Sequence, residues 1–349
     1  MSIVEKADKF IIIDELSFFG NQMKSELFEI LGTFVTDSHF AGNNRKRKLI
    51  EESNENEMKQ ISKLIGFSNY FKAQTEVKDN NLEARNSAKK VLETVHLRFA
   101  ISCTDILEID DDSHFSSLFC NNIMSSWIRN SSDSAKILTS DENRFLIPPN
   151  SIFHIGDITD INSYSKYHDI RFDLVIADPP WFNKSVKRKK TYQMNEDVLE
   201  DLELDQMITD DCLVGFWITN RIGLREELEE HLKKWNLEII GEWKWLKVTR
   251  SGIPVYDFSK SKHKLPYEDI IFATTLNSKK YEHFPKTLVF SSVPMAVHSH
   301  KPPIIGILND LGYQFERPLE LFARNLLPNF TSIGFEPLLL QSDLVYNGI

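Results

Sequence analysis

Short apolar runs alternate with polar and amphipathic segments through the second half of the chain. The apolar runs predict buried strands at residues 151–155, 172–177, 213–219, 237–240, 268–273 and 319–323. Residues 223–235 predict a helix, because their leucines share one face and their acids and lysines are spaced for i,i+4 ion pairs. Strands that alternate with helices indicate an α/β fold with a mostly parallel central sheet flanked by helices.

The first 145 residues lack this rhythm and are rich in Phe, Ser, Asn and acidic residues. Residues 80–83 are typical of a helix start and predict a helix through residues 84–92. Residues 43–58 are polar and charged and predict an exposed linker. We therefore expect a mostly helical N-terminal accessory region of unknown role at residues 1–145. The α/β domain is expected at residues 146–349.

The composition is that of an ordinary soluble protein, with 41% hydrophobic and 26% charged residues. No run of 18 apolar residues is present, so we expect no contact with a membrane. The acids around the first apolar block argue against a secretory signal. Three cysteines, Cys103, Cys120 and Cys212, are too few and too scattered for a disulfide framework or a zinc site. We expect a reducing compartment and no metal.

The net charge of −10 argues against a surface that binds nucleic acid all over. A local basic groove remains compatible with it, because salt screens charges beyond about 8–10 Å. Four consecutive basic residues, Arg45 to Lys48, fit either a solvated charged segment or a nuclear localisation signal. The expected location is the nucleus, with the cytoplasm as an additional compartment.

The string Asp178-Pro179-Pro180-Trp181 follows the apolar run at residues 172–177. It lies just past the carboxyl end of a predicted strand, where open α/β sheets bind ligands. A carboxylate and a rigid proline carbonyl can accept the two N–H groups of a base, and an aromatic ring can stack on that base. The four residues therefore favour catalysis of methylation at an exocyclic amino group. The alternative is a Pro-Pro turn that closes a core strand over a buried Trp.

A basic segment comes directly after this string. Residues 184–190 carry five cations, with an aromatic residue on either side. Cations position phosphates and aromatic rings stack on bases, so we expect contact with a polynucleotide rather than only a mobile charged loop. A second basic cluster, residues 260–264, is expected on the same surface. The acidic stretch at residues 196–211 is interpreted as a solvated helix face.

Several common nucleotide and hydrolase motifs are absent from the chain. It contains no G-x-G-x-x-G, no Walker-A loop, no H-E-x-x-H and no G-x-S-x-G. These absences argue against a dinucleotide site of the usual kind. S-adenosylmethionine fits a nucleotide-sized crevice without a phosphate cradle, because it has no phosphates.

Further strings extend the pattern in collinear order: IPPNS at 147–151, WITNR at 217–221, EWKWLKVTRSG at 242–252, KLPYE at 264–268, HSHKPP at 298–303 and LFARNL at 321–326. With the DPPW string they resemble the eukaryotic DPPW adenine-N6 methyltransferases, which include the mRNA adenosine methyltransferase. The resemblance is closest to the branch called methyltransferase-like protein four, and it covers roughly residues 147–340. It implies a Rossmann-like methyltransferase fold with permuted motif order.

The resemblance also implies a cofactor site for S-adenosylmethionine, with S-adenosylhomocysteine as the product. Asp157 and Ile158 would contact the adenine of the cofactor. Lys301 would pair with the methionine carboxylate, Arg324 would approach the ribose, and Glu336 would hold a ribose hydroxyl.

Asp178 would meet both the target amine and the methionine ammonium. The residues expected to bind the substrate are Asn183, Lys184, Ser185, Lys187, Arg188 and Asn220.

The last family string departs from its usual form. The family pattern is Trp-Thr-x-Trp-Gly-Asn-Glu, whereas residues 330–336 read Phe-Thr-Ser-Ile-Gly-Phe-Glu. Phe335 stands where an Asn hydrogen-bonds the ribose, and Ile333 replaces an aromatic residue. We expect the loss of about one hydrogen bond to the cofactor, on the order of 1 kcal/mol.

The expected function is N6-methylation of adenosine in RNA by a monomer that needs no metal. The family branch implies the internal 2′-O-methyladenosine of U2 small nuclear RNA as the target. One alternative is the same reaction on DNA adenine, which would require base extrusion from a duplex. Another is a non-catalytic, nucleic-acid-binding subunit of a methyltransferase complex.

Overall fold

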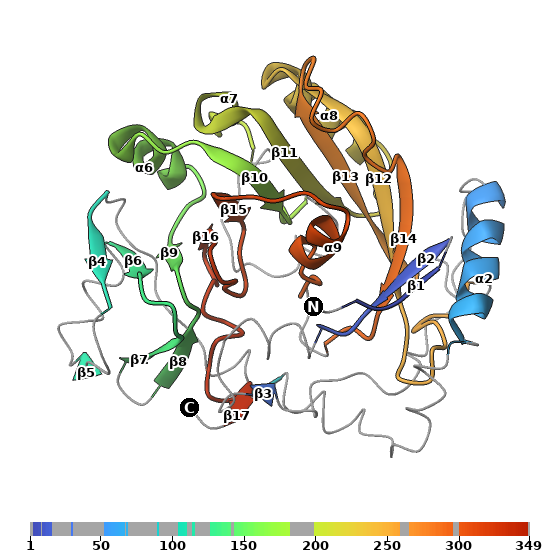
Figure 1. Cartoon of the computed structure of the whole chain (residues 1–349), viewed down its shortest axis with the longest axis horizontal. Helices are drawn as coiled ribbons and strands as arrows, with labels where there is room; N and C mark the ends of the chain where they lie inside the picture. The colour runs from blue at the N-terminus through green and yellow to red at the C-terminus, as the bar shows by residue number, and fades with distance from the viewer. Residues whose placement is uncertain are drawn as a thin grey trace.

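The computed structural model describes residues 3–7, 9–15, 29–30, 52–66, 68, 89–90, 104–109, 114–115, 126–140, 143–181, 199–258, 265–295 and 300–347. A 12-stranded sheet forms the centre of the molecule (Figure 1), in the order β1-β2-β14-β12-β13-β11-β10-β15-β16-β9-β6-β4. Its strands are β1 (Ile3–Ala7), β2 (Phe10–Ile13), β4 (Ile106–Glu108), β6 (Trp127–Asn130), β9 (Ser151–Ile155), β10 (Phe172–Ala177), β11 (Ile208–Ile218), β12 (Leu237–Lys247), β13 (Tyr267–Thr275), β14 (Thr287–Ser292), β15 (Pro318–Leu321) and β16 (Thr331–Gly334).

Two smaller sheets and five helices complete the described structure. One sheet pairs β3 (Glu29–Ile30) with β17 (Tyr346–Asn347), and the other joins β5 (His114–Phe115), β7 (Lys136–Ser140) and β8 (Asn143–Ile147). The helices are α2 (Glu52–Gly66), α6 (Asp160–His168), α7 (Leu204–Met207), α8 (Leu224–Lys234) and α9 (Ile305–Asp310). Among the residues described, every helix is too short or too polar to span a bilayer.

The central part of the sheet is mostly parallel. β9, β16, β15, β10 and β11 pair in parallel in that order. β13 is antiparallel to both β11 and β12, and β14 and β2 then continue in parallel with β12. This mixed sheet with flanking helices confirms the Rossmann-like methyltransferase fold expected from the sequence.

Both faces of the central strands are buried, which explains their continuous apolar runs. In β10, Val175 and Ala177 face the core beneath α6, α7 and α8, whereas Leu174 and Ile176 face the core beneath α9. The leucines of α8 are buried against the first of these cores, as their spacing predicts. Figure 1 shows α6, α7 and α8 along one side of the sheet and α9 on the other.

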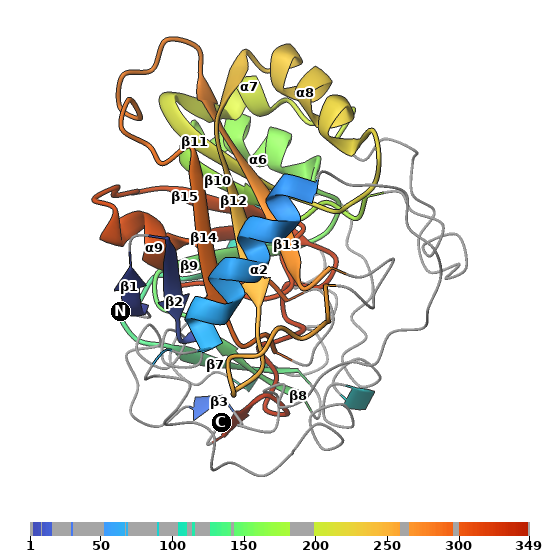
Figure 2. The same cartoon turned by 90° about the vertical axis from the view of Figure 1, so that its right-hand side faces the viewer.

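The N-terminal region differs from the expectation. Within residues 1–145 the described elements are mainly strands, and β1, β2, β4 and β6 extend the central sheet at both ends. The expected mostly helical region is therefore wrong for the part that the structure describes. α2 packs beside β2 (Figure 2), with Met58, Ile61 and Ile65 in one core with Phe10 and Ile12.

Two predictions about individual segments are also wrong. The second half of the polar stretch at residues 43–58 is not a linker, because α2 begins at Glu52 and buries Met58. The acidic stretch is not one solvated helix face, because α7 spans four residues, β11 starts at Ile208, and Leu202 and Leu204 are buried. Of the helix expected at residues 84–92, only residues 89–90 are described, and they are helical. The basic segment at residues 45–48 lies outside the described residues.

Two strands, β12 and β15, end at other residues than the sequence predicted. β12 continues to Lys247, well past the expected end at residue 240, because β13 and β14 pair with it on both sides. β15 stops at Leu321 rather than at residue 323, because Phe322 has a φ of +59°. That left-handed conformation ends the strand and turns the chain toward Arg324.

Candidate active site

The carboxyl ends of parallel strands bring the candidate residues to one edge of the sheet. Ala177 at the end of β10 is in register with Phe216 of β11 and Leu321 of β15. β16 and β9 follow in the same direction, so the segments after five strands meet at this edge. Asp157, Asp178, Asn220, Arg324 and Glu336 all lie in these segments, which is the position where open α/β sheets bind ligands.

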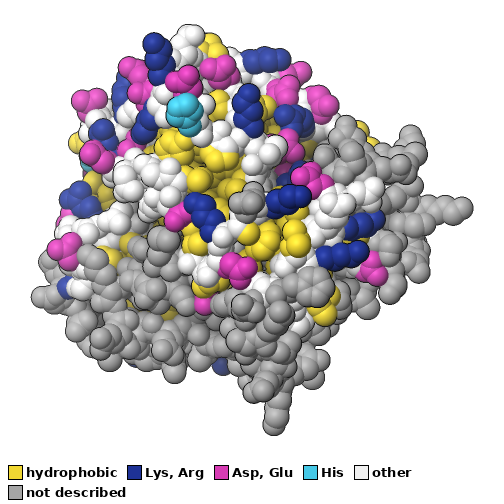
Figure 3. All heavy atoms as spheres, turned by 45° about the vertical axis from the view of Figure 1, so that its right-hand side comes forward, with side chains coloured by type: hydrophobic (Ala, Val, Ile, Leu, Met, Phe, Trp, Pro, Cys, Tyr) yellow, Lys and Arg dark blue, Asp and Glu magenta, His cyan; other side chains and the backbone are white. Residues whose placement is uncertain are grey.

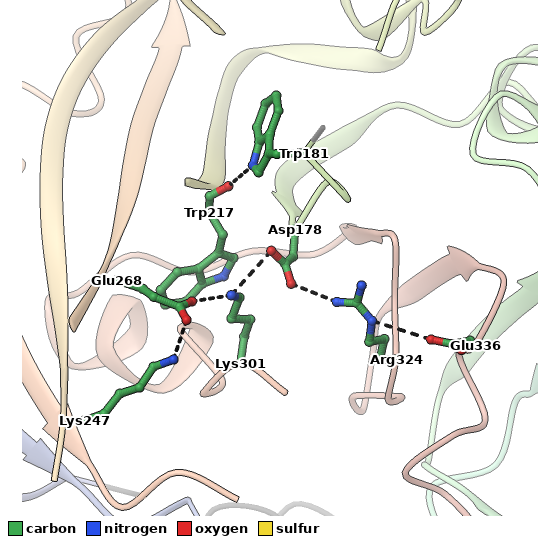
Figure 4. A network of polar contacts seen from close by, with 8 residues as sticks. All are labelled: Asp178, Trp181, Trp217, Lys247, Glu268, Lys301, Arg324 and Glu336. Carbon is green, nitrogen blue, oxygen red and sulfur yellow. Dashed lines mark hydrogen bonds and ion pairs between the residues drawn. The ribbon is translucent and has the colours of Figure 1, made fainter. Parts of the chain in front are cut away.

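Asp178 lies between two cations (Figure 4). Its Oδ2 accepts a hydrogen bond from Nη1 of Arg324 at 2.8 Å, and its Oδ1 is 3.4 Å from Nζ of Lys301. The three side chains are only 15–21% exposed, so solvent weakens their attraction less than on an open surface. Two of the residues expected to bind the cofactor, Lys301 and Arg324, thus directly contact the expected catalytic carboxylate.

A chain of ion pairs connects Asp178 to Lys301, Lys301 to Glu268, and Glu268 to Lys247. We call these four residues the lysine arm. Lys301 and Lys247 each donate a hydrogen bond to Glu268. Burial alone would raise the pKa of Glu268, but attraction to Lys301 and Lys247 outweighs it and lowers the pKa to about 2. The aromatic wall of this arm is Trp217, whose ring centroid lies 5.2 Å from Nζ of Lys301.

The other arm leads from Asp178 through Arg324 to Glu336, and we call these three residues the arginine arm. Nε of Arg324 is 3.6 Å from Oε2 of Glu336, whose side chain is 43% exposed. The arm is fixed at its backbone, because a Cβ at Gly334 would come within 2.8 Å of the Ala323 nitrogen. Close backbone approach of β16 to the turn at Phe322–Ala323 therefore requires glycine here.

A buried carboxyl beneath Asp178 was not predicted from the sequence. Glu320 in β15 is in register with Ile176 of β10 and with Ser332 of β16. Oε2 of Glu320 and Oγ of Ser332 are buried and find no hydrogen-bond partner among the described residues. Burial, and then the charge of Asp178, raise the pKa of Glu320 to about 8, although Arg324 opposes this. The signal available in the sequence was an acid inside an apolar run, PLEL.

Glu268 and Lys247 were also missed as site residues. Glu268 is the second residue of β13, and Lys247 is the last residue of β12. Only the pairing of these strands brings the two charges together, since Leu246 is in register with Tyr267.

Trp181 does not have the expected position. Its side chain is 5% exposed and packs in the core with Phe216 and Leu224. Its indole Nε1 donates a hydrogen bond of 2.7 Å to the carbonyl of Trp217. The ring therefore anchors the loop after β10 to β11, and stacking of this ring on a base does not fit the structure.

The prolines of the string shape the same loop. Pro179 is buried, and its carbonyl accepts a hydrogen bond of 2.7 Å from the backbone nitrogen of Trp181. A carbonyl has two lone pairs, so Pro179 retains capacity for one further donor. Pro180 is partly buried.

The remaining candidates are either exposed, buried in the core or outside the described residues. Asp157 is exposed past β9, where its Oδ1 accepts hydrogen bonds from the backbone and hydroxyl of Thr159. The side chain of Ile158 is in the core, so an adenine contact would have to use its backbone. Asn220 is exposed after β11. The other expected substrate residues lie outside the described residues: Asn183, Lys184, Ser185, Lys187 and Arg188.

The two departures from the family string have different environments. Ile333 is fully buried in β16 within the core beneath α6, so its replacement of an aromatic residue changes the core. Phe335 is partly buried just past β16, between that strand and Glu336.

Charge on the face of the molecule drawn in Figure 3 is mixed in sign. On the face in Figure 3, apolar side chains gather in the middle, with Lys, Arg, Asp and Glu side chains interspersed around them. In the described ranges, no group of three or more His, Cys, Asp and Glu residues is placed to hold a metal ion. The contacts of Asp178 with Lys301 and Arg324 provide hydrogen bonding by charges of both signs.

Comparison with known proteins decides the family. Residues 172–336 match the MT-A70 family. The chain is also 44% identical over 356 residues to a Caenorhabditis elegans protein named DNA N6-methyl methyltransferase, covering 97% of this chain and 98% of that protein. The chain belongs to the MT-A70 family.

Other relatives match over a shorter length of the chain. The human N(6)-adenine-specific methyltransferase METTL4 is 36% identical over 225 residues, which span 61% of this chain and 47% of METTL4. The N6-methyladenosine RNA methyltransferase MTA1 of Pyricularia oryzae is 33% identical over 212 residues, or 57% of this chain and 56% of MTA1. The expected family and its METTL4 branch are confirmed.

The MT-A70 chain described here is therefore an adenine-N6 methyltransferase. Membership implies S-adenosylmethionine as the methyl donor. The DPPW string is intact in this chain, and the alternatives of a non-catalytic subunit and of a fortuitous Pro-Pro turn are set aside.

Proposed function

We propose that this methyltransferase modifies the N6 amine of adenosine in RNA, and that its target is the internal 2′-O-methyladenosine of U2 small nuclear RNA. The observation that carries the proposal is the placement of Asp178. Its carboxylate lies at the carboxyl end of β10 and is held between Lys301 and Arg324. No other carboxylate of the DPPW loop is available among the described residues for the target amine.

The chemical problem is a weak nucleophile, because the lone pair of an adenine amine is delocalised into the ring. Bound S-adenosylmethionine supplies an electrophilic methyl group. The Asp178 carboxylate and the second lone pair of the Pro179 carbonyl accept the two N–H groups of the amine, which draws the nitrogen toward a tetrahedral geometry. Since both acceptors are fixed by the loop after β10, positioning contributes much of the acceleration.

The charged residues of both arms suit the donor. Lys301 would hold the methionine carboxylate and Asp178 its ammonium group, as charge-assisted hydrogen bonds favour. Arg324 and Glu336 would bind the ribose, while Asp157 and the backbone of Ile158 would bind the adenine. The buried polar atoms of Glu320 and Ser332 support a polar ligand on this side of the sheet, because such atoms are costly to leave without a partner.

The substrate class rests on the relatives and on the surroundings of the DPPW loop. MTA1 of Pyricularia oryzae is named as an RNA methyltransferase. The basic segment at residues 184–190 directly follows the loop in sequence, and Asn220 is exposed at the same edge of the sheet. These groups would contact phosphates and the bases next to the target. An unpaired base in RNA reaches such a site without extrusion from a duplex.

DNA adenine is a second candidate, favoured by one observation. The relative that matches over nearly the whole chain is named as a DNA methyltransferase. Single-stranded DNA and RNA present the same adenine edge, so discrimination would depend on contacts with the 2′ position of the ribose.

A side-by-side assay with purified protein and S-adenosylmethionine separates the candidates. The substrates are four oligonucleotides of one sequence: RNA with 2′-O-methyladenosine at the target, unmodified RNA, single-stranded DNA and duplex DNA. The proposal predicts the highest kcat/KM on the 2′-O-methylated RNA. A higher value on either DNA would overturn the RNA assignment while leaving adenine-N6 methylation intact.

We further propose that the enzyme acts in the nucleus and as a monomer. The nuclear location follows from a small nuclear RNA target and from the basic residues at positions 45–48. Imaging of the tagged full-length chain tests the location, and light scattering during size-exclusion chromatography tests the mass. Uniform cytoplasmic signal or a dimer mass would contradict these two assignments.

A further inference from the structure

A carboxylate from the N-terminal segment lies behind the lysine arm. Glu15 follows β2, and its side chain is only 2% exposed. β2 pairs in parallel with β14, with Ile12 in register with Ser291. The carboxyl ends of these two strands therefore point to the same edge of the sheet as β10 and Asp178.

Glu15 has two buried partners on that edge. Its Oε1 accepts a hydrogen bond from the hydroxyl of Ser292, the last residue of β14. Its Oε2 lies 3.5 Å from Nδ1 of His300, whose side chain is 1% exposed. A buried carboxylate is costly unless it is hydrogen-bonded or paired, and the Ser292 hydroxyl supplies the hydrogen bond here.

Each partner leads directly to the lysine arm. His300 immediately precedes Lys301, the residue that contacts both Asp178 and Glu268. The Ser292 hydroxyl in turn accepts a hydrogen bond of 2.8 Å from Nε1 of Trp245.

Trp245 connects this group to the other lysine of the arm. Nζ of Lys247 lies 4.4 Å from the Trp245 ring centroid, and Lys247 pairs with Glu268. Trp245 also packs edge-on against Trp217, the ring beneath Lys301. Glu15 thus reaches both lysines through rigid, buried side chains.

We infer that Glu15 is a positioning residue for this methyltransferase: it orients His300 and Trp245, and through them Lys301 and Lys247. The N-terminal segment then belongs to the catalytic unit rather than to a separate accessory region. Displacement of a positioned group by about 1 Å can cost 10²-fold in rate. Loss of the Glu15 carboxylate should therefore change donor binding measurably, although Glu15 acts on the lysines only through other residues. The inference rests on the proposed role of Lys301 in holding the donor.

The test uses the full chain and S-adenosylhomocysteine as the probe, with affinity measured by calorimetry and stability by thermal melting. Glu15→Gln keeps the shape and an acceptor for Ser292 but removes the charge opposite His300. We expect its dissociation constant to rise about tenfold, with KM for S-adenosylmethionine raised more than kcat is lowered. The matched control is Glu5→Gln, which removes a carboxylate of the same hairpin that pairs with Ser68 instead, and it should bind as the wild type does.

Two reference variants make the outcome decisive. His300→Asn keeps a donor near the Nδ1 position. Its affinity should stay within about threefold of the wild-type affinity, which a purely structural role of His300 would not require. Lys301→Met tests the proposed function itself: if it binds S-adenosylhomocysteine normally, the role of Lys301 is wrong. If Lys301→Met loses affinity while folded Glu15→Gln binds normally, the inference about Glu15 alone is overturned. Should Glu15→Gln not fold, Ser292→Ala carries the same expected loss and the same contradiction.

Discussion

Two arms of charge meet at Asp178, and they are built differently. The lysine arm is enclosed by Trp217 and Trp245, and its carboxylate, Glu268, is 26% exposed and has hydrogen bonds from two lysines. The arginine arm ends at Glu336, which is 43% exposed and 3.6 Å from its partner. The first arm is partly buried along its whole length and doubly paired, whereas the second opens to solvent at Glu336.

The difference indicates which side of the site is fixed and which side can adapt. Exposed ion pairs contribute little, whereas buried and hydrogen-bonded charges hold their geometry. The departure from the family string, Phe335, lies beside the open arm rather than the enclosed one. We therefore expect the lysine arm to dominate binding of the donor and the arginine arm to tolerate substitution.

Loss of the lysine arm should have the largest effect on donor binding. Lys301→Met removes a charge-assisted hydrogen bond, commonly about 1.5–3 kcal/mol, and should weaken S-adenosylhomocysteine binding roughly 100-fold. The matched control is Lys244→Met, a lysine of similar burial that pairs with Asp269 and Glu242 away from Asp178. Calorimetry should find normal affinity for the control, and equal losses in both variants would refute a specific role of Lys301.

The arginine arm should show a smaller effect. Arg324→Met removes a more exposed group and should weaken binding about tenfold, since solvent screens part of its interaction. Arg225→Met is the control, because Arg225 of α8 forms two ion pairs, with Glu229 and Glu242, that do not involve Asp178. An effect as large as that of Lys301→Met, measured in the same calorimetric series, would remove the distinction between the arms.

The pH dependence of stability tests the buried carboxyl between the arms. The folded pKa of Glu320, about 8, lies above its ordinary value of 4.5, so the neutral form stabilises the fold. This contribution is complete below pH 4.5 and is lost as the pH rises through 8. Compared with Glu320→Gln, which cannot titrate, the wild type should lose melting temperature as the pH rises from 4.5 to about 8. Parallel melting curves across this range would show that Glu320 titrates normally.

The smallest effect is expected at Trp181, outside both arms. Trp181→Phe loses the hydrogen bond to the Trp217 carbonyl, about 1 kcal/mol in the free energy of unfolding, and should change kcat only a few-fold. Trp181→Ala should destabilise the fold by about 3–5 kcal/mol, because it empties a core position. A 100-fold loss of kcat in Trp181→Phe with unchanged melting would instead indicate direct contact between the ring and the substrate.

Periodicity and motif position predicted the elements that carry Asp178. The strand at residues 172–177 and the leucine face of α8 match the structure, because both depend on local alternation of apolar side chains. The position of Asp178 at the strand end followed from the same local pattern.

The partners of Asp178 depend on long-range pairing, which local patterns do not encode. Lys247 and Glu268 meet only through the register of β12 and β13. Glu15 reaches the site through β2 and β14, which are about 280 residues apart in sequence. Burial of Trp181 was stated only as the alternative to stacking, because an aromatic residue past a strand suits stacking on a base and packing in a core equally well.

Transfer of an isotopically labelled methyl group tests the central claim most directly. Wild-type protein, Asp178→Asn and the control Asp173→Asn are incubated with S-adenosylmethionine carrying a CD3 group and an adenine-containing oligonucleotide. Asp173 lies on the same strand but accepts hydrogen bonds from the backbone of Glu316 and Arg317 at the far end. Mass spectrometry should find labelled N6-methyladenine with the wild type and with Asp173→Asn, and at least about 1,000-fold less with folded Asp178→Asn. Labelled product at the wild-type rate from Asp178→Asn would contradict the account.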